Sequence, residues 1–373
     1  MKIANIETYR LAVPLIKPFK TALRTVETAY AVVVKISCDN GVVGWGEAPP
    51  TVVITGEGMD SIEAAIHQVL KPFLIQQDLN QYETIFQGIH TLLVGNTSAK
   101  AAIDMALYDC IAQQCKLPLY QYLGGHKNEI ETNYTVSVND PKEMGEDAIS
   151  YVRQGFHVLK VKVGKDLIET DIERIQEIRR RIGNHIKIRL DANQGWKAKE
   201  AVRAIQKMED LDLNIELVEQ PVKAWDIEGL KQVTDHVETP IMADESVFTP
   251  KQAFEVIKTR SADLINIKLM KSGGIYQAQM INQLAEINGM ECMVGSMIET
   301  RIGISAAAHF AASKKNITRF DFDAPLMLAQ DVVEGGIIYN GRKITLPDSF
   351  GLGISNVQKE GDAANVKQSK MAN

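Results

Sequence analysis

A short apolar segment that carries two lysines constrains this chain more than any other stretch. Residues 158–164 read Val-Leu-Lys-Val-Lys-Val-Gly, which is typical of a parallel strand covered on both faces. Because side chains alternate along a strand, Lys160 and Lys162 must point to the same side. Two like charges in an interior are costly unless acidic groups lie opposite them. The segment therefore predicts a polar site inside the fold, lined by lysines and carboxylates.

Strand and helix patterns alternate through residues 126–325. Amphipathic helical stripes, such as the isoleucines within 168–182, separate the strand candidates. These candidates cover 132–138, 158–164, 186–191, 215–219, 241–244, 264–269, 291–295 and 317–322. Eight strands alternating with helices over about 200 residues predict an α/β fold with a TIM-type barrel. The segment after the eighth strand has no helical pattern, so the sequence does not predict the last helix of such a barrel.

Residues 1–125 predict a separate α+β module. Its strand patterns cover 3–14, 29–38 and 42–48, and its helical patterns lie near 60–74, 81–93 and 98–115. Two irregular stretches, 17–25 and 49–56, have the length of binding loops or lids. At the other end, residues 326–355 contain a hairpin pattern near 335–342 that is expected to return to this module. Residues 356–373 predict a polar tail.

Composition excludes several classes of protein. A formal net charge of −6 without any basic run argues against nucleic-acid binding. No stretch approaches the roughly 18 apolar residues of a membrane span, and the N-terminus has no signal-peptide core. The four cysteines are widely spaced and are expected to be free thiols. We therefore expect a soluble cytoplasmic protein with no membrane partner.

Three consecutive strand candidates end in a carboxylate. Asp191, Glu219 and Asp244 are spaced by about one strand–helix unit, and such strand ends converge on one mouth of a barrel. Each acid alone would serve equally well as a helix N-cap. Three ionised carboxylates in one mouth, however, need a cation, and oxygen ligands without histidine or cysteine favour Mg²⁺ over Zn²⁺. The set predicts a magnesium site.

The next strand ends in Lys268, about four strands from Lys160 and Lys162 and hence across the barrel mouth. A single lysine at such a place is usually a solvated cap or an ion-pair partner. Here it completes an arrangement of lysine, metal and lysine that suits proton transfer on two faces of a bound carbon. A neighbouring ammonium group and a divalent cation would both favour the neutral amine that acts as a base.

These residues together resemble the enolase superfamily, in its muconate-lactonising-enzyme subgroup. The resemblance covers nearly the whole chain and implies a (β/α)₇β barrel, with an N-terminal α+β capping domain completed by the C-terminal segment. It also implies one Mg²⁺ per subunit, abstraction of the proton α to a substrate carboxylate, an enediolate stabilised by the metal and a lysine, and a homo-oligomer. In that scheme Lys162 and Lys268 are the two bases, and Lys160 stabilises the enediolate.

Asp321 and Asp323 lie on one face of the eighth strand and narrow the range of activities within this subgroup. This Asp-x-Asp is similar to the motif by which dipeptide epimerases of the L-Ala-D/L-Glu type hold a substrate ammonium group. A structural ion pair with Arg319 or a lysine is the alternative. The resemblance implies further substrate contacts at Thr135, Ser296, Arg24, Ile54 and Ile298, and supporting partners of the metal ligands at Asn193 and Glu245.

Other activities share much of this residue set. The enzymes o-succinylbenzoate synthase, N-succinylamino-acid racemase and muconate cycloisomerase have the lysines and the metal site, but their substrates lack a free ammonium group. An acid-sugar dehydratase would need a histidine near Ser296. A dipeptide-binding barrel without catalysis is the non-enzymatic alternative. Arg24 favours an acidic second residue in the dipeptide, whereas the apolar neighbours favour a hydrophobic one, so both substrate classes stay open.

Overall fold

Eight parallel strands form the central sheet of the computed structural model, which describes residues 1–358. In sheet order they are β5 (Tyr134–Val136), β6 (Val158–Lys162), β7 (Lys187–Asp191), β8 (Ile215–Glu219), β9 (Ile241–Ala243), β10 (Leu264–Ile267), β11 (Glu291–Val294) and β12 (Ile317–Phe320). The first and last strands meet where Asn133 N donates to Phe320 O at 3.4 Å and Phe322 N donates to Thr132 Oγ1 at 2.8 Å. These contacts join the two edges of the sheet, as a barrel requires.

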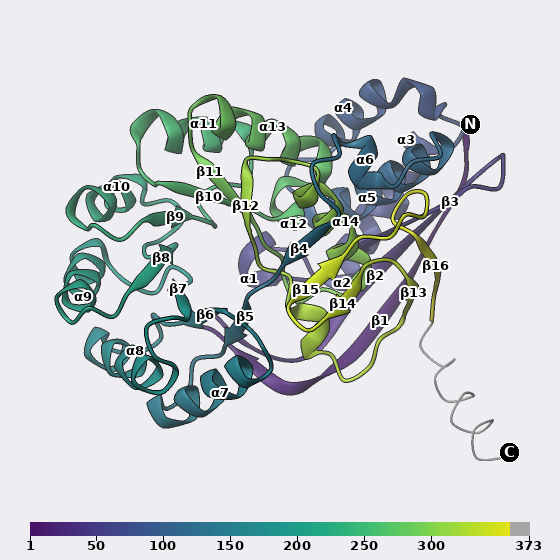
Figure 1. The fold of residues 1–373 in the computed structure, drawn as a ribbon. Coiled ribbons are helices and arrows are strands. Elements are labelled where there is room, and N and C mark those ends of the chain that lie inside the picture. Colours follow the sequence, from purple (N-terminus) through teal and green to yellow (C-terminus); the bar gives the residue numbers. More distant parts are fainter. Residues whose placement is uncertain (359–373) are drawn as a thin grey trace, which may run out of the picture.

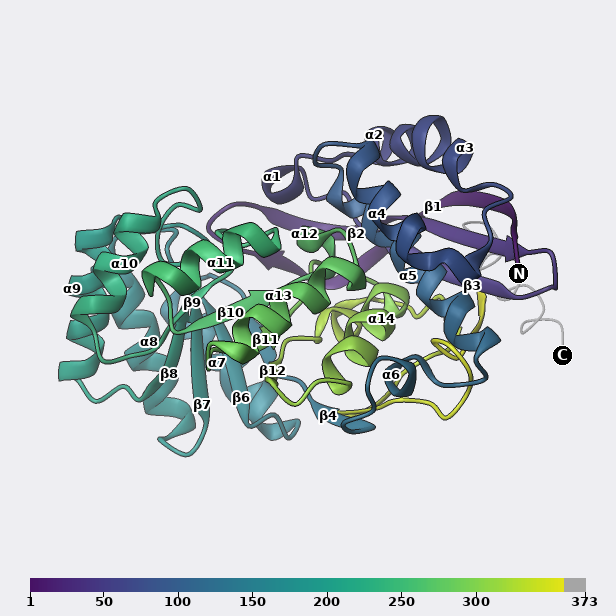
Figure 2. The ribbon, with the colours of Figure 1, turned by 90° about the horizontal axis from the view of Figure 1, so that it is seen from above.

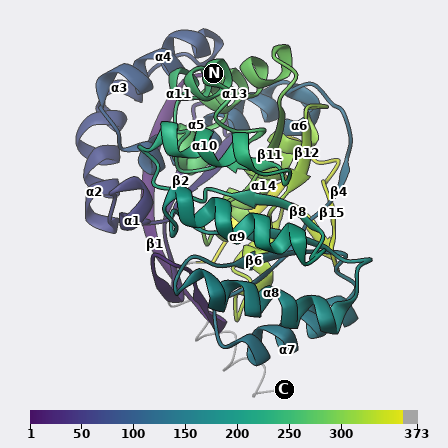
Figure 3. The same cartoon turned by 90° about the vertical axis from the view of Figure 1, so that its left-hand side faces the viewer.

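Helices connect these strands along the outside of the barrel (Figures 1 and 3). They are α7 (Pro141–Arg153), α8 (Ile168–Ile182), α9 (Ala198–Asp210), α10 (Ile227–His236), α11 (Pro250–Thr259), α12 (Leu269–Ser272), α13 (Ile275–Ile287) and α14 (Arg301–Ala312). The short α12 and the longer α13 share one connection. Only a 3₁₀ turn, η3 (Ala324–Met327), follows β12. The predicted (β/α)₇β order is therefore confirmed.

An apolar layer fills the barrel below its carboxyl ends. Leu217, Met242, Leu264 and Met293 form one buried cluster. Leu217 and Met242 lie two positions before Glu219 and Asp244, so alternation along β8 and β9 points each apolar residue and its acid to the same interior. The carboxylates therefore stand on a packed apolar floor that keeps water away from them on that side.

An antiparallel sheet and a set of helices form the N-terminal unit, which lies beside the barrel (Figure 2). Its elements are β1 (Ile3–Lys20), β2 (Thr25–Cys38), β3 (Val43–Ala48), α1 (Val52–Thr55), α2 (Met59–Ala64), η1 (Ala65–Leu70), α3 (Lys71–Leu74), η2 (Leu79–Gln81), α4 (Tyr82–Leu92), α5 (Thr97–Gln114) and α6 (Leu119–Tyr122). Helix α5 is buried over most of its length. It packs so closely on β3 that a Cβ at Gly46 would lie 1.9 Å from Ala102 O.

The stretch 17–25 is not the irregular loop that the sequence predicts. Strand β1 continues to Lys20, and only a tight turn, in which Thr21 N donates to Arg24 O at 2.9 Å, separates it from β2. Pro14 and Pro18 concealed this extension. Because β1 is the edge strand of its sheet, a proline there costs no ladder hydrogen bond on the open side. The second irregular stretch, 49–56, contains the one-turn helix α1.

The C-terminal segment contacts both parts of the molecule. Its strands are β13 (Val333–Gly335), β14 (Ile338–Asn340), β15 (Lys343–Thr345) and β16 (Ile354–Val357), and β15 pairs with β4 (Glu129–Glu131) at the start of the barrel. Leu119 N of α6 donates to Gly351 O at 2.8 Å. Strand β16 ends two residues beyond the predicted segment because Val357 pairs with Val333. The rest of the predicted tail, 359–373, lies outside the described residues.

None of the helices within residues 1–358 has the length and apolar character needed to cross a membrane.

Asp109 of α5 holds three parts of the chain together, so its removal should destabilise the fold. Its buried carboxylate accepts from Trp45 N of β3 at 3.0 Å and from Leu352 N of the C-terminal segment at 2.9 Å. Asp109→Ala leaves both buried N–H groups without an acceptor, so unfolding free energy should fall by about 2–4 kcal/mol. Asp109→Asn keeps one acceptor oxygen and should lose about half as much. Urea denaturation checks this, and equal stability of all three proteins contradicts it.

Candidate active site

Strand β6 delivers both predicted lysines to the barrel interior. Lys160 and Lys162 are 2% and 6% exposed, so both ammonium groups are withdrawn from water. In the ladder Lys162 lies opposite Asp191 of β7, and its Nζ is 2.6 Å from Asp191 Oδ2. Lys162 Nζ also lies 5.6 Å from the ring centre of Phe19, near the tip of the β1–β2 hairpin. The hairpin therefore covers one of the two lysines.

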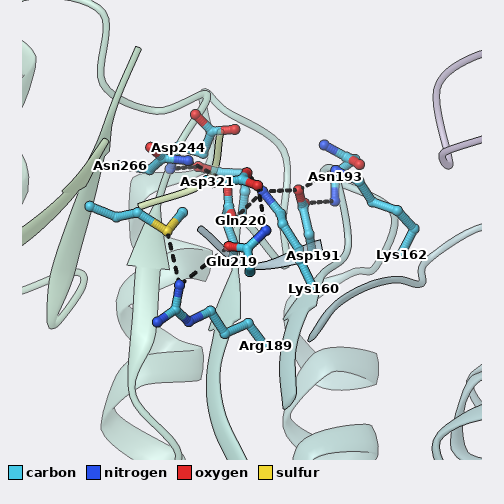
Figure 4. A network of polar contacts seen from close by, with 12 residues as sticks. Lys160, Lys162, Arg189, Asp191, Asn193, Glu219, Gln220, Asp244, Asn266 and Asp321 are labelled. Atoms are coloured by element: carbon cyan, nitrogen blue, oxygen red, sulfur yellow. Dashed lines mark hydrogen bonds and ion pairs between the residues drawn. The ribbon is translucent and has the colours of Figure 1, made fainter. Parts of the chain in front are cut away.

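Lys160 lies between three carboxylates (Figure 4). Its Nζ is 3.0 Å from Asp191 Oδ2, 2.7 Å from Glu219 Oε2 and 2.8 Å from Asp321 Oδ2. Burial alone would lower the pKa of Lys160, but the carboxylates outweigh burial and hold it well above its usual value. Burial likewise opposes the ionised form of Asp191, yet the two lysines hold the pKa of that carboxyl below its usual range. Lys160 is therefore a permanent cation here.

Asp244 follows β9 and is held by two lysines from the next connection. Lys268 Nζ lies 2.6 Å from Asp244 Oδ2, and Lys271 Nζ lies 2.7 Å from Asp244 Oδ1. Burial would lower the pKa of Lys268, but Asp244 raises it above its usual value. Lys271 also donates to three backbone carbonyls, those of Asp244, Val247 and Asn266. It anchors the loop after β9 as well as the carboxylate.

The two acids after β12 have different surroundings. Asp321 pairs with Lys160 and accepts from Asn133 Nδ2 at 2.7 Å. Asp323 accepts from Thr135 N at 2.6 Å, and no lysine or arginine within residues 1–358 forms an ion pair with it. Burial, followed by repulsion from Asp321, raises the pKa of Asp323 to about 7. Asp323 is thus a buried carboxyl group without a cation of its own.

One pocket brings most of the predicted residues together. It lies above the carboxyl ends of the strands, between the barrel and the N-terminal unit. Of the predicted residues it is lined by Arg24, Ile54, Thr135, Lys160, Lys162, Asn193, Glu245, Lys268, Ser296, Ile298, Asp321 and Asp323. Asp191, Glu219 and Asp244 are fully buried beneath this lining. Residues distant in sequence therefore share a single site, and none of the predicted site residues lies elsewhere.

Carboxyl groups outnumber ammonium groups in this network. Its buried acids are Asp191, Glu219, Asp244, Glu245, Asp321 and Asp323, and its buried lysines are Lys160, Lys162, Lys268 and Lys271. The excess is visible in the pKa values: burial, then Asp191, raises that of Glu219 to about 7, and burial, then Asp244, raises that of Glu245 to about 8. One divalent cation would balance this excess, and an all-oxygen donor set suits Mg²⁺.

The acids are not gathered around one point in this structure. No group of three or more His, Cys, Asp or Glu side chains among residues 1–358 has its donor atoms assembled as a metal site requires. Lys160 lies between Asp191 and Glu219 instead. Adjacent register still brings Asp191 and Glu219 side by side. The donor chemistry and the charge balance fit a hard divalent cation, which would replace some of these lysine contacts.

Several residues that hold the site were not predicted. They are Lys271, Asn133, Asn266 and Gln220. Asn266 donates to Glu219 Oε1 at 2.7 Å, and Gln220 Oε1 accepts from Asp244 N at 2.9 Å. Asn266 lies two positions before Lys268, so strand alternation could have revealed it. Gln220 gives no such signal, because it follows its strand with a backbone at positive φ that the sequence does not specify.

The fold and the site together define the class of protein to which this chain belongs. This is a barrel whose polar mouth, at the carboxyl ends of the strands, is covered by an N-terminal capping unit, as in many barrel enzymes. Residues 5–124 match the mandelate racemase/muconate lactonizing enzyme N-terminal domain, and residues 143–359 match the enolase C-terminal domain-like family. The chain belongs to the mandelate racemase/muconate lactonizing enzyme family of the enolase superfamily, as the resemblance implied.

Similar proteins within this family include epimerases of dipeptides. The L-Ala-D/L-Glu epimerase of Bacillus subtilis is 68% identical, with 95% of this chain and 97% of that protein covered. The structure of its substrate-liganded complex superposes with a TM-score of 0.95 at 67% identity, covering 96% and 100%. A dipeptide epimerase from Enterococcus faecalis, complexed with Mg and L-Leu-L-Tyr, is 45% identical, with a TM-score of 0.92 and coverage of 95% and 100%.

Proposed function

We propose that this protein is a Mg²⁺-dependent dipeptide epimerase of the L-Ala-D/L-Glu type. The observation that carries the proposal is the lining of the pocket: Lys162 and Lys268, from strand ends four strands apart, share it with Asp323, a carboxyl group with which no lysine or arginine of residues 1–358 forms an ion pair. The identity of 68% to the Bacillus subtilis epimerase supports the same activity. A cytoplasmic location, expected from the sequence, and a homo-oligomeric state, implied by the family resemblance, belong to this proposal too.

The chain's own residues supply the acid–base chemistry in this scheme. Asp191, Glu219 and Asp244 would hold the Mg²⁺, with Asn193 and Glu245 beside them: Asn193 N donates to Asp191 Oδ1 at 2.9 Å, and its side chain donates to Glu245 at 3.3 Å. Bound Mg²⁺ would supply positive charge beside the substrate carboxylate and acidify the adjacent α-carbon.

Two lysines then move one proton each. The neutral amine of Lys162 or Lys268 takes the α-proton, and the ammonium group of the other returns a proton to the opposite face, so the α-carbon is inverted with no net change in composition. Lys268 carries a raised pKa while it is paired with Asp244. Lys268 can act as a base only when the negative charge of Asp244 is neutralised by another cation. The fixed ammonium group of Lys160 stabilises the enediolate charge.

Asp323 is expected to hold the substrate ammonium group. Asp323→Asn should lower kcat/KM for a free dipeptide by about 10²–10³-fold, because a buried charge-assisted hydrogen bond is lost. In the native enzyme, KM should fall as the pH rises through about 7, since Asp323 ionises there and only the carboxylate attracts the ammonium. Steady-state kinetics on L-Ala-L-Glu measure both effects. A KM that is unchanged in the variant removes this role.

Arg24 favours an acidic second residue. Its half-buried guanidinium lines the pocket, and among residues 1–358 no carboxylate pairs with it. Burial lowers the pKa of Arg24, so a ligand carboxylate would stabilise the charged guanidinium. Arg24→Met should raise KM for L-Ala-L-Glu by about 10–100-fold and leave L-Ala-L-Leu within about threefold. The apolar neighbours Leu23, Ile54 and Ile298 favour the second candidate, a hydrophobic dipeptide. Equal losses on both substrates would contradict an acidic preference.

Deuterium exchange tests the proposed activity directly. Purified protein with Mg²⁺ is incubated in D₂O with a library of L,L-dipeptides and with N-succinylamino acids, and mass spectrometry follows incorporation at the α-carbon. We expect exchange and epimerisation of L-Ala-L-Glu, with weaker exchange of hydrophobic dipeptides. Exchange confined to N-succinylamino acids would overturn the proposal in favour of a racemase. Dipeptide binding without any exchange would leave a binding protein.

A further inference from the structure

A carboxylate of the N-terminal unit contacts a barrel helix that begins next to the site. Glu47 lies in β3, is fully buried, and accepts from Thr300 N at 2.9 Å, Thr300 Oγ1 at 2.7 Å and Gly303 N at 2.9 Å. These donors belong to the first turn of α14, the helix that follows β11. A residue some 250 positions earlier therefore caps a barrel helix with a negative charge at its positive end.

A second glutamate encloses the same helical turn. Glu299 is 2% exposed, and its Oε1 accepts from Met297 N at 2.8 Å. A Cβ at Gly303 would lie 2.2 Å from Glu299 Oε2 and 3.3 Å from Glu47 Oε2, so both carboxylates fill the space that this glycine leaves. Neither glutamate has an ion-pair partner within residues 1–358. Their donors are the backbone and the hydroxyl group of this one segment.

These contacts fix the connection between β11 and α14. Glu299 holds it at Met297, and Glu47 holds it at Thr300. Three residues of this connection, Ser296, Met297 and Ile298, form one wall of the pocket. Glu47 itself does not line the pocket, so it acts on the site only through this wall.

The wall stands beside Arg24. Ile298 and Arg24 line both the active-site pocket and the neighbouring groove along β2, which also includes Pro49, Pro50 and Thr51. Those three residues directly follow β3, the strand that carries Glu47. The loop that follows this strand and the wall that its Glu47 carboxylate holds therefore both border the groove that Arg24 lines.

We propose that Glu47 is a positioning residue that sets the β11–α14 wall and thereby the recognition of the dipeptide's second side chain. The inference rests on the proposed function and specifies which part of the substrate this wall contacts. A displacement of about 1 Å at such a wall is enough to change turnover by about 10²-fold.

Asp104 offers a matched control. It is a fully buried carboxylate of the N-terminal unit, on α5, and caps another barrel helix, α13, by accepting from Ile275 N at 2.6 Å and Tyr276 N at 3.2 Å. Its replacement removes the same kind of contact between the same two parts. It leaves the Ser296–Ile298 wall untouched.

The experiment compares Glu47→Ala, Glu47→Gln and Asp104→Ala with the native enzyme. We expect Glu47→Ala to reduce the preference for L-Ala-L-Glu over L-Ala-L-Leu, measured as the ratio of kcat/KM values, by about tenfold. Amide hydrogen exchange over residues 297–303 should accelerate in the same variant. Glu47→Gln, which retains one acceptor oxygen, should recover part of both. Asp104→Ala should lower the melting temperature and leave the preference and this exchange within about twofold of native.

Two results would overturn the inference, and they are distinguishable. A native enzyme that epimerises dipeptides, combined with a Glu47→Ala preference no different from that of Asp104→Ala, would make Glu47 a purely structural residue. A native enzyme that exchanges no dipeptide would overturn the proposed function, and the inference with it.

Discussion

Lys268→Ala is expected to abolish epimerisation, with a loss of about 10⁴-fold, while α-proton exchange with solvent continues on one epimer of the substrate. The reason is the separation of the two lysines by four strands of the barrel, which places one on each side of the pocket. With Lys268 removed, Lys162 can still take and return a proton on its own face. Lys162→Ala should show the converse, with exchange confined to the other epimer.

Proton NMR in D₂O with each pure epimer measures both reactions in one sample. Lys258→Ala, at an exposed position of α11, is the control for a lysine lost from the barrel surface and should behave as the native enzyme does. Interconversion of both epimers at native rates by Lys268→Ala would refute the two-base assignment. Loss of exchange from both epimers would instead point to a role for Lys268 in holding Asp244.

Strand alternation explains why so much of the site could be predicted from the sequence. Side chains alternate along a strand with a period of two, and each barrel unit contributes one strand. These two regularities suffice to bring Lys160, Asp191 and Glu219 to one mouth, without any knowledge of packing. The ion pairs that hold them follow a different logic. Lys271 is an ordinary helical lysine in sequence, and its three carbonyl acceptors come from segments that meet only in the folded protein.

Prediction from the sequence fails at the edge strand of a sheet and at a helix that is capped by a residue distant in the sequence. The extension of β1 past Pro14 depends on its lying at the edge of a sheet, which periodicity within one strand cannot reveal. Glu47 is similar. Its role gives no signal in the sequence, because the helix against which it is buried lies some 250 residues later in the chain. Both depend on which segments, distant in the sequence, lie beside them in the folded protein.

Glu219→Gln is expected to lower the epimerase activity by at least about 10³-fold and, at the same time, to stabilise the metal-free protein against unfolding. Glu219 lies between Asp191 and Asp244, and burial and these neighbours raise its pKa to about 7 despite the adjacent Lys160. A folded-state pKa above the ordinary value of 4.5 means that ionisation of Glu219 opposes folding. The cost is absent below about pH 4.5 and complete above about pH 7.

The neutral amide of the variant carries no such cost. In EDTA, the melting temperature of Glu219→Gln should exceed that of the native protein by about 2–4 °C at pH 8, and the difference should vanish near pH 5. Added Mg²⁺ should raise the melting temperature of the native protein and leave the variant unchanged, because a carboxylate ligand is missing. Asp323→Asn is the control, since it also neutralises a buried acid but should retain the response to Mg²⁺. A variant that is less stable than the native protein at pH 8 without metal would show that the Lys160 ion pair outweighs the repulsion among the carboxylates, and that the site is held together before any cation binds.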